Sequence, residues 1–269
     1  MSELFVLING EPFNANDASL SVFNLGFQYG FGIFTTLRIE EGKVLNWDCH
    51  TARIREHCDF FSLSMPAYIE TLLPKLISLN EAEKGVWKGK IIVSKNKDST
   101  SLSLATLEPY KNSINPWKLA SIPLPRQPIL SKYKTLSYIE MIWLAEVALK
   151  NNVDEMLICN GDGTLLETSK SALCWIHQGK LFYPSFDLPL LRSTALTQII
   201  NSHEFKSIST IAALQEIPAS ASVFAINALQ GVIPIQSIDS LMFNQDPVLH
   251  QRLLSCLGIN RSSAILFVD

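Results

Sequence analysis

The segment that decides the architecture is NPWKLASIPLPRQPILSKYKTLSY, residues 115–138. Its first half is rich in proline, which opposes regular secondary structure and is typical of a connection between domains. Its second half leads into residues 135–150, whose composition fits a helix. We therefore predict an interdomain linker over 116–130, an N-terminal α/β domain over 1–115 and a C-terminal domain over 131–269.

Short apolar runs bounded by turn residues lie on both sides of this linker. The dipeptide Asn9-Gly10, which readily adopts the positive φ angles of a tight hairpin turn, ends the run over residues 4–8. Other runs predict strands at 33–39, 43–47, 91–94, 102–107, 156–158, 165–167, 172–176, 181–183, 223–226 and 232–236. Helical spacing or capping residues predict helices over 48–61, 69–79, 190–203 and 247–257. The chain is therefore expected to have an α/β (α+β) fold.

The composition limits the classes of partner. With 269 residues, of which 47% are hydrophobic and 17% charged, the chain can bury a full core. The net charge of −3 and the isoelectric point near 6.0 leave no cationic surplus for nucleic acid or an acidic membrane surface. The longest apolar helix-like stretch, residues 139–149, contains two glutamates and is too short to span a bilayer. We expect a soluble protein that binds neither nucleic acid nor membranes.

The cysteines and the N-terminus indicate the compartment. The five cysteines are scattered and have neither the spacing nor the nearby histidines of zinc ligands, so no metal site is predicted. The N-terminus lacks the cationic start of a signal peptide. We expect buried thiols in a reducing cytoplasm.

Two features of the sequence suit an anionic ligand. Arg53 lies among apolar positions of its helix, where a guanidinium is costly unless it meets an anion, although it could equally reach water at the edge of that face. Leu190 and Leu191 follow Pro189 at the expected start of a helix, where backbone N–H groups favour a phosphate. Every helix has such an end, so this second feature is weak alone.

Three further features are ambiguous when each is taken alone. Lys134 is near apolar residues, which can lower the pKa of an amine and make it a nucleophile, but most such lysines are solvated. Glu167 follows two leucines and is either a surface acid or a placed partner. Residues 227–231 form a small-residue turn that could bring backbone close to a ligand, as many β-turns do.

Five short segments occur in an order that is typical of one enzyme class. They are YGFGIFTTLR at 29–38, HTARI at 50–54, KTLSY at 134–138, ETSKS at 167–171 and LLR at 190–192. They are similar to the Y-G-D-G-x-F-E-T-x-R, H-x-x-R-L, K-[ST]-x-[NS]-Y, E-x-x-x-S and G-I-T-R segments of fold type IV pyridoxal-phosphate enzymes, the branched-chain aminotransferase-like class. Each motif is loose, but five in this order are much more specific.

The resemblance implies a two-domain fold type IV architecture with pyridoxal 5'-phosphate in the cleft between the domains, commonly in a homodimer whose partner chain helps close the site. By this resemblance Lys134 is the catalytic lysine, Arg53 binds the cofactor phosphate and Glu167 pairs with the pyridine nitrogen. The full set of implied cofactor-binding residues is Arg53, Lys134, Tyr138, Glu167, Leu190, Leu191, Asn227 and Ala228.

The subfamily is indicated by fewer residues. The run NALQGVIP at 227–234 is similar to the N-[AS]-L-x-G-x-x-P-V run of aminodeoxychorismate lyases, where branched-chain aminotransferases usually carry G-T-A. The pair Thr35-Thr36 also resembles those lyases, and residues 95–101 lack the R-x-H pair of D-amino acid aminotransferases. Thr36 is therefore a candidate for a catalytic hydroxyl near the substrate, although a plain cross-strand threonine fits equally well.

The lyase resemblance implies a reaction that releases pyruvate and p-aminobenzoate from 4-amino-4-deoxychorismate, a step of folate biosynthesis. Three residues depart from the family pattern: Phe31 replaces Asp, Ala172 replaces Asn and Pro189 replaces Gly. Two alternatives therefore stay open. One is a D-amino acid or branched-chain aminotransferase that uses the same lysine and glutamate, and the other is a non-catalytic cofactor-binding protein.

Overall fold

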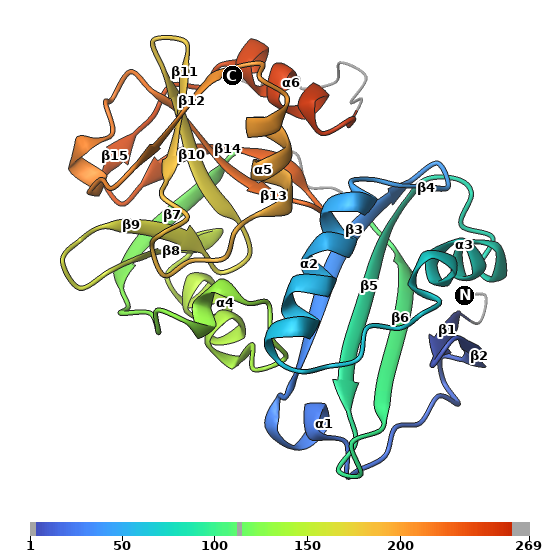
Figure 1. Ribbon diagram of the computed structural model, residues 1–269. Helices are drawn as coiled ribbons and strands as arrows, with labels where there is room; N and C mark the ends of the chain where they lie inside the picture. Colours follow the sequence, from blue (N-terminus) through green and yellow to red (C-terminus); the bar gives the residue numbers. More distant parts are fainter. Residues whose placement is uncertain (1–3, 112–114, 260–269) are drawn as a thin grey trace. The chain divides into compact units, whose positions relative to one another are not determined.

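The computed structural model describes residues 4–111 and 115–259, which divide into two compact units (Figure 1). Unit 1 comprises the chain up to Lys111 together with Tyr133–Tyr138, and unit 2 comprises the rest. The lysine-bearing segment Tyr133–Tyr138 thus belongs to unit 1, although it follows the proline-rich stretch in the sequence. The domain limits given above stay a prediction.

Unit 1 is an antiparallel sheet with helices packed on it. Its elements are β1 (Phe5–Ile8), β2 (Glu11–Asn14), α1 (Leu25–Tyr29), β3 (Gly32–Glu40), β4 (Lys43–Val44), α2 (Trp47–Phe60), α3 (Ile69–Leu79), β5 (Val86–Lys95) and β6 (Ser101–Pro109). The strand order is β2-β1-β6-β5-β3-β4. The predicted hairpin at Asn9-Gly10 is confirmed, since both residues have positive φ angles, 51° and 83°, between the paired strands β1 and β2.

The core of unit 1 lies between its sheet and the helices α2 and α3. Ile33, Leu37 and Ile39 face this core from β3, because alternate residues of a strand point to the same side. Ile54 and Cys58 reach it from α2, and a row of leucines and isoleucines reaches it from α3. The intervening residues of β3, among them Phe34, Thr36 and Arg38, therefore belong to the opposite face of the sheet.

Unit 2 contains most of the remaining strands. Its elements are β7 (Trp117–Pro123), the 3-10 turn η1 (Leu130–Lys132), α4 (Ile139–Lys150), β8 (Glu155–Cys159), β9 (Leu165–Thr168), β10 (Ala172–His177), β11 (Lys180–Pro184), α5 (Thr194–Asn201), β12 (Lys206–Thr210), η2 (Leu214–Glu216), β13 (Ser222–Asn227), β14 (Gly231–Ile238), β15 (Leu241–Met242) and α6 (Pro247–Cys256). Their order is β12-β11-β10-β13-β14-β7-β8-β9. Because β9 also pairs with β10, the strands from β10 to β9 form a closed ring around an apolar core.

Two expectations about regular structure in unit 2 are wrong. The proline-rich stretch contains β7, whose residues Trp117 and Leu119 are buried in the ring and which pairs in parallel with both β8 and β14. The helix expected at 190–203 begins only at Thr194, because the Ser193 hydroxyl accepts the Leu196 N–H at 3.2 Å and caps it there.

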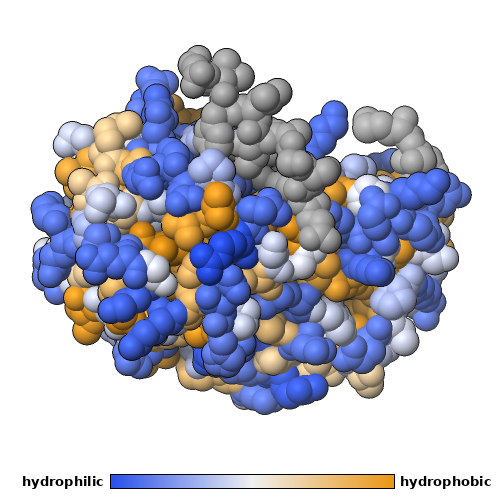
Figure 2. Space-filling model, turned by 90° about the horizontal axis from the view of Figure 1, so that it is seen from above, coloured by the Kyte–Doolittle hydropathy of each residue, from blue (hydrophilic) through white to orange (hydrophobic). Residues whose placement is uncertain are grey.

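Hydrophilic side chains cover much of the face drawn in Figure 2, with hydrophobic patches between them. Large apolar side chains are exposed on two elements in particular. On α4, Ile139, Ile142 and Trp143 are 82%, 60% and 49% exposed. Phe23, just before α1, is 60% exposed, and Phe27, within α1, is 73% exposed. Within residues 4–111 and 115–259, no helix combines the length and apolarity that a bilayer-spanning segment needs.

Candidate active site

Lys134 lies on an extended segment that runs beside strand β3. Its carbonyl oxygen accepts the Phe34 N–H at 2.9 Å, and two residues later the Leu136 N–H donates to the Gly32 carbonyl at 2.9 Å. These two backbone hydrogen bonds flank Thr135 and hold the segment directly after the lysine against β3. The sequence predicted a helix that begins at residue 135. The helix α4 begins only at Ile139, because the residues before it pair with β3 instead.

Two glycines of the 29–38 motif allow this close approach. A Cβ atom on Gly30 would lie 2.9 Å from the Cα atom of Ser137, and one on Gly32 would lie 2.7 Å from the Cδ1 atom of Leu136. Gly30 also has a φ of 67°, in the left-handed region that favours glycine. The glycines therefore make room for the segment that bears Lys134.

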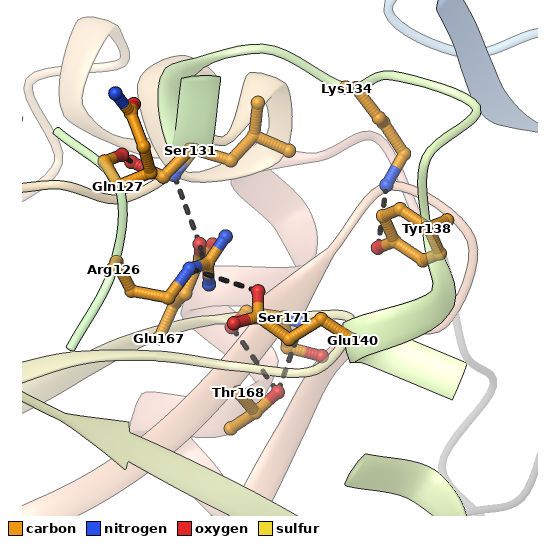
Figure 3. A network of polar contacts seen from close by, with 10 residues as sticks. Arg126, Gln127, Ser131, Lys134, Tyr138, Glu140, Glu167, Thr168 and Ser171 are labelled. Atoms are coloured by element: carbon orange, nitrogen blue, oxygen red, sulfur yellow. Dashed lines mark hydrogen bonds and ion pairs between the residues drawn. The ribbon is translucent and has the colours of Figure 1, made fainter. Parts of the chain in front are cut away.

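Aromatic and hydroxyl groups surround the Lys134 amine. Its Nζ donates to the Tyr138 hydroxyl at 3.1 Å (Figure 3) and lies 4.6 Å from the centre of the Phe34 ring. The Phe34 and Tyr138 rings meet edge to face, with centroids 5.1 Å apart. The amine is half-buried against these rings, an environment that fixes its position and limits its contact with water.

A second lysine that the sequence reasoning missed approaches the same ring. The Lys90 ammonium lies 4.4 Å from the centre of the Phe34 ring. Burial first, and then the nearby Lys88 ammonium, lower the pKa of Lys90. Lys90 on β5 is directly opposite Thr36 on β3, which places the candidate hydroxyl beside this cation. The alternation of β5 could have revealed Lys90, since Lys88 and Lys90 alternate with the core-facing Ile91 and Val93 and belong to the opposite face.

Two histidines and an arginine are buried along α2. His50, Arg53 and His57 are only 0%, 9% and 3% exposed. His50 Nδ1 lies 2.6 Å from the Thr35 hydroxyl, and His57 Nδ1 accepts the backbone N–H of Lys134 at 3.4 Å. Among the described residues the buried Nε2 atom of His50 has no hydrogen-bond partner.

Burial and nearby cations keep both histidines neutral. Burial is the larger cause and the charges of Arg53 and Lys134 add to it, so that the pKa values of His50 and His57 fall from 6.5 to about 3. The positive charge in this part of unit 1 is therefore carried by Arg53 and Lys134. A buried guanidinium next to neutral imidazoles favours an anionic ligand.

In unit 2, Glu167 is held by an arginine that the sequence reasoning also missed. The Arg126 Nη1 atom donates to Glu167 Oε1 at 3.3 Å, and its Nε lies 3.2 Å from Glu140 Oε2 (Figure 3). The Leu191 N–H donates to the same Glu167 oxygen at 3.1 Å. These donors stabilise the ionised carboxylate and fix its direction. Arg126 lies in the stretch taken as linker and has no local pattern that marks it.

The sequence predicted that the backbone N–H groups of Leu190 and Leu191 lie at the start of a helix, but they do not. They precede α5 by several residues, and both are already engaged: Leu190 donates to the Leu188 carbonyl at 2.8 Å and Leu191 to Glu167. The premise that they form the open end of a helix is therefore wrong. The N–H of Leu191 instead joins the segment before α5 to the carboxylate predicted to face the pyridine nitrogen.

Asn227 shapes the turn between β13 and β14. Its Oδ1 atom accepts the N–H groups of Leu229 and Gln230 at 3.0 and 2.7 Å. Its Nδ2 atom donates to the Ser171 hydroxyl at 3.0 Å, which joins this turn to the one after β9. Ala228 follows in the turn and is half-buried. Asn227 thus fixes the backbone of Ala228 from both sides.

The comparisons with known proteins identify the family. A model of the family described as amino-transferase class IV matches residues 32–238. The chain belongs to this class IV aminotransferase family. An aminodeoxychorismate lyase of Bacillus subtilis is 23% identical to it over 88% of both chains. A putative branched-chain-amino-acid aminotransferase of Methanocaldococcus jannaschii is 20% identical over 90% of this chain and 91% of its own.

Solved structures confirm the predicted fold type IV architecture. A hypothetical aminotransferase from Mycobacterium tuberculosis, in its PLP-bound form, superposes on 96% of this chain and 100% of its own with a TM-score of 0.87 and 14% identity. At this identity the likeness concerns the fold. Membership of the class IV aminotransferase family confirms that the cofactor is pyridoxal 5'-phosphate.

The side chains of each unit of this class IV aminotransferase-family protein suit that cofactor. Unit 1 offers the immobilised Lys134 amine for the aldehyde, the buried Arg53 for the phosphate and the buried Nε2 atom of His50, which lacks a hydrogen-bond partner in the part of the chain that the structure describes. Unit 2 offers Glu167, a carboxylate bound by the Arg126 guanidinium, for the ring nitrogen. The chemistry of this donor set fits the group, and the three departures at Phe31, Ala172 and Pro189 remove none of its members.

Proposed function

We propose that this protein is a pyridoxal-phosphate-dependent 4-amino-4-deoxychorismate lyase, which releases pyruvate and p-aminobenzoate in folate biosynthesis. The observation that carries the proposal is the similarity to the lyase of Bacillus subtilis over 88% of both chains. The lyase-like run at 227–234 supports it. Asn227, the first residue of that run, organises the β13–β14 turn through four hydrogen bonds, two accepted and two donated.

Each cofactor-binding residue has a role that its contacts support. When bound, pyridoxal phosphate supplies a ring that accepts the electron pair left on the substrate carbon. Arg53 binds the phosphate, because a buried guanidinium prefers an anion. Glu167 holds a proton at the pyridine nitrogen, and the contact with Arg126 orients the Glu167 carboxylate for that task.

Lys134 is the proton carrier of the proposed reaction. Its amine removes the proton from the ring carbon that bears the substrate nitrogen, while the Tyr138 hydroxyl, 3.1 Å away, holds the amine in place. The bond between the ring and the enolpyruvyl oxygen then breaks, the departing enolate takes up the proton that Lys134 removed and becomes pyruvate, and the ring becomes aromatic. Lys90 neutralises a substrate carboxylate, and the Thr36 hydroxyl opposite it lies near the leaving group.

The proposed assembly is a homodimer. Exposed apolar side chains support this proposal, because groups of this kind favour a protein partner. They are Ile139, Ile142 and Trp143 of α4, Phe27 of α1 and Phe23 just before α1. Light scattering of the purified protein tests the proposal, and a monomer at micromolar concentration contradicts it.

A product assay on freshly purified protein tests the function. The protein is incubated with aminodeoxychorismate, and pyruvate and p-aminobenzoate are measured together. Equal amounts of both are expected, and a Lys134→Ala variant is expected to form neither. Cofactor binding without either product contradicts the lyase proposal and leaves an aminotransferase or a non-catalytic cofactor-binding protein.

An aminotransferase is the second candidate, favoured by the similarity to the Methanocaldococcus jannaschii protein over 90% of this chain. It uses the same lysine and glutamate but returns the proton to the cofactor carbon rather than eliminating a group. Incubation with a D-amino acid or a branched-chain amino acid and 2-oxoglutarate distinguishes the two. Formation of glutamate at a rate above that of pyruvate release selects the aminotransferase.

A further inference from the structure

Glu155 is a fully buried carboxylate for which the proposed chemistry has no direct use. It begins β8 and has an exposed fraction of 0%. The Ser169 hydroxyl donates to its Oε2 atom at 2.5 Å, and the Lys170 ammonium lies 2.5 Å from its Oε1 atom. A carboxylate in such a place is costly to desolvate and depends on partners of this kind.

Both partners lie in the turn that directly follows Glu167. Thr168 and Ser171 close this turn, since the Thr168 N–H donates to the Ser171 carbonyl at 2.8 Å and the Ser171 N–H donates to the Thr168 hydroxyl at 3.0 Å. Glu167 is the last residue before the turn and pairs with Ala172 across it. The position of the turn therefore determines the direction of the Glu167 side chain.

The strand register places Glu155 under this turn. β8 and β9 are antiparallel, and Leu157 of β8 pairs with Thr168 at the end of β9. Glu155 lies two residues before Leu157 on β8. It therefore faces the residues that follow the end of β9. The Lys170 ammonium, half exposed at 50%, closes the outer side of the carboxylate and lies 5.7 Å from the centre of the Trp117 ring.

The same turn contacts the segment of Asn227. Ser171 accepts the Asn227 side-chain N–H at 3.0 Å, so that a rigid β9–β10 turn also restrains the β13–β14 turn. The path from Glu155 through Ser169 and Ser171 thus reaches two segments that resemble cofactor-binding segments of the family. An apolar residue of similar volume at position 155 could fill the core equally well, but it would not fix one geometry of the turn.

We infer that Glu155 is a positioning residue, which anchors the β9–β10 turn through Ser169 and Lys170 and so directs Glu167 toward the pyridine nitrogen. The inference rests on the proposed role of Glu167 toward pyridoxal phosphate. Glu155 itself does not touch the cofactor or the substrate.

Two variants test this role with readouts other than activity. Ser169→Ala removes the hydroxyl, and Glu155→Gln keeps the volume of the side chain but removes its charge. For each, apoprotein is titrated with pyridoxal phosphate, and the pH midpoint of the visible absorbance of the bound cofactor is measured. Each variant is expected to raise the dissociation constant about fivefold, as the loss of one hydrogen bond does.

The pH midpoint gives the sharper result. A Glu167 carboxylate that no longer points at the ring nitrogen lowers the proton affinity of that nitrogen, and Glu167→Gln does the same. Ser169→Ala and Glu155→Gln should therefore shift the midpoint in the same direction as Glu167→Gln, by a smaller amount. Adding Ser169→Ala to Glu167→Gln should cause no further shift, because the affected carboxylate is already gone.

Matched controls separate positioning from general stability. Ser220→Ala removes an exposed serine of the same unit, and Glu204→Gln removes a carboxylate of an exposed ion pair. Both should leave the midpoint and the dissociation constant at the parental values. Should Glu155→Gln fail to fold, Ser169→Ala decides alone.

Two failures are distinguishable. In the first, Ser169→Ala and Glu155→Gln keep the parental dissociation constant and pH midpoint, whereas Glu167→Gln shifts the midpoint. This result overturns the positioning role of Glu155 and leaves the role of Glu167 intact. Parental values in Glu167→Gln itself overturn the proposed role of Glu167 and, with it, this inference.

Discussion

Replacing Arg126 by methionine tests how the Glu167 carboxylate is held. Arg126 is 8% exposed and contacts Glu167, which is 10% exposed, and Glu140, which is 37% exposed. Arg126→Met keeps most of the side-chain volume, while Glu167 stays almost buried and still accepts the Leu191 N–H. The variant therefore isolates the contribution of the Arg126 guanidinium to stabilising the buried Glu167 carboxylate.

The magnitude follows from burial. Breaking a buried ion pair by removing one partner costs about 3–5 kcal/mol, because the other charge stays desolvated. Glu140 is more exposed and adds little, and the Leu191 N–H still stabilises Glu167. We expect the free energy of unfolding of the apoprotein to fall by about 3 kcal/mol in urea denaturation.

A double variant and a control complete the experiment. Adding Glu167→Gln to Arg126→Met should recover most of the loss, because no charge is then left buried. The control Arg252→Met breaks the Arg252–Glu204 pair, whose members are 45% and 43% exposed, and should cost less than about 1 kcal/mol. Equal losses in Arg126→Met and Arg252→Met would refute the reasoning.

Three further predictions concern the other residues of the site. Borohydride reduction of the holoprotein should fix the cofactor on Lys134, and peptide mapping that finds the label on Lys132 contradicts the assignment. Arg53→Ala should weaken the binding of pyridoxal phosphate to apoprotein at least roughly tenfold, since a charge-assisted contact is lost, and an unchanged dissociation constant removes Arg53 from the phosphate site. Acidification from pH 7.5 to 5.5 should lower the free energy of unfolding by about 1 kcal/mol for His50 and as much for His57. The pKa values of about 3 in the folded state lie below the ordinary 6.5, so the unfolded chain takes up the protons first, and stability present above pH 6.5 is lost as the pH falls toward 3. A His50→Gln variant with the parental pH dependence contradicts this account.

The sequence predicted those parts of the fold that local patterns determine. The Asn9-Gly10 hairpin and the helix at Ile69–Leu79 are confirmed, because turn chemistry and apolar spacing act over a few residues. The early start expected for α5 is wrong, because a serine that caps a helix outweighs the continuing apolar pattern before it. The sequence did not predict the strand β7, because prolines disfavour a strand and only the pairing with β8 and β14 offsets them.

The candidate site was visible in the sequence only where motifs exist. Lys134, Arg53 and Glu167 stand in segments that resemble family motifs, and their roles stay predictions. Arg126 and Glu155 have no motif, and each contacts residues that are distant in the sequence. Such contacts depend on tertiary structure that no local pattern encodes.

The position of β7 within the ring of unit 2 has a consequence for the order of synthesis. Its neighbour β8 follows soon after it in the chain, but Trp117 also pairs with Ile235 of β14, which leaves the ribosome much later. Until β14 is synthesised, the edge of β7 that pairs with it lacks its partner strand. Long-range parallel pairing of this kind forms slowly. Nascent chains that stop before Gly231 should therefore aggregate through this edge, whereas chains that include Ile238 should not.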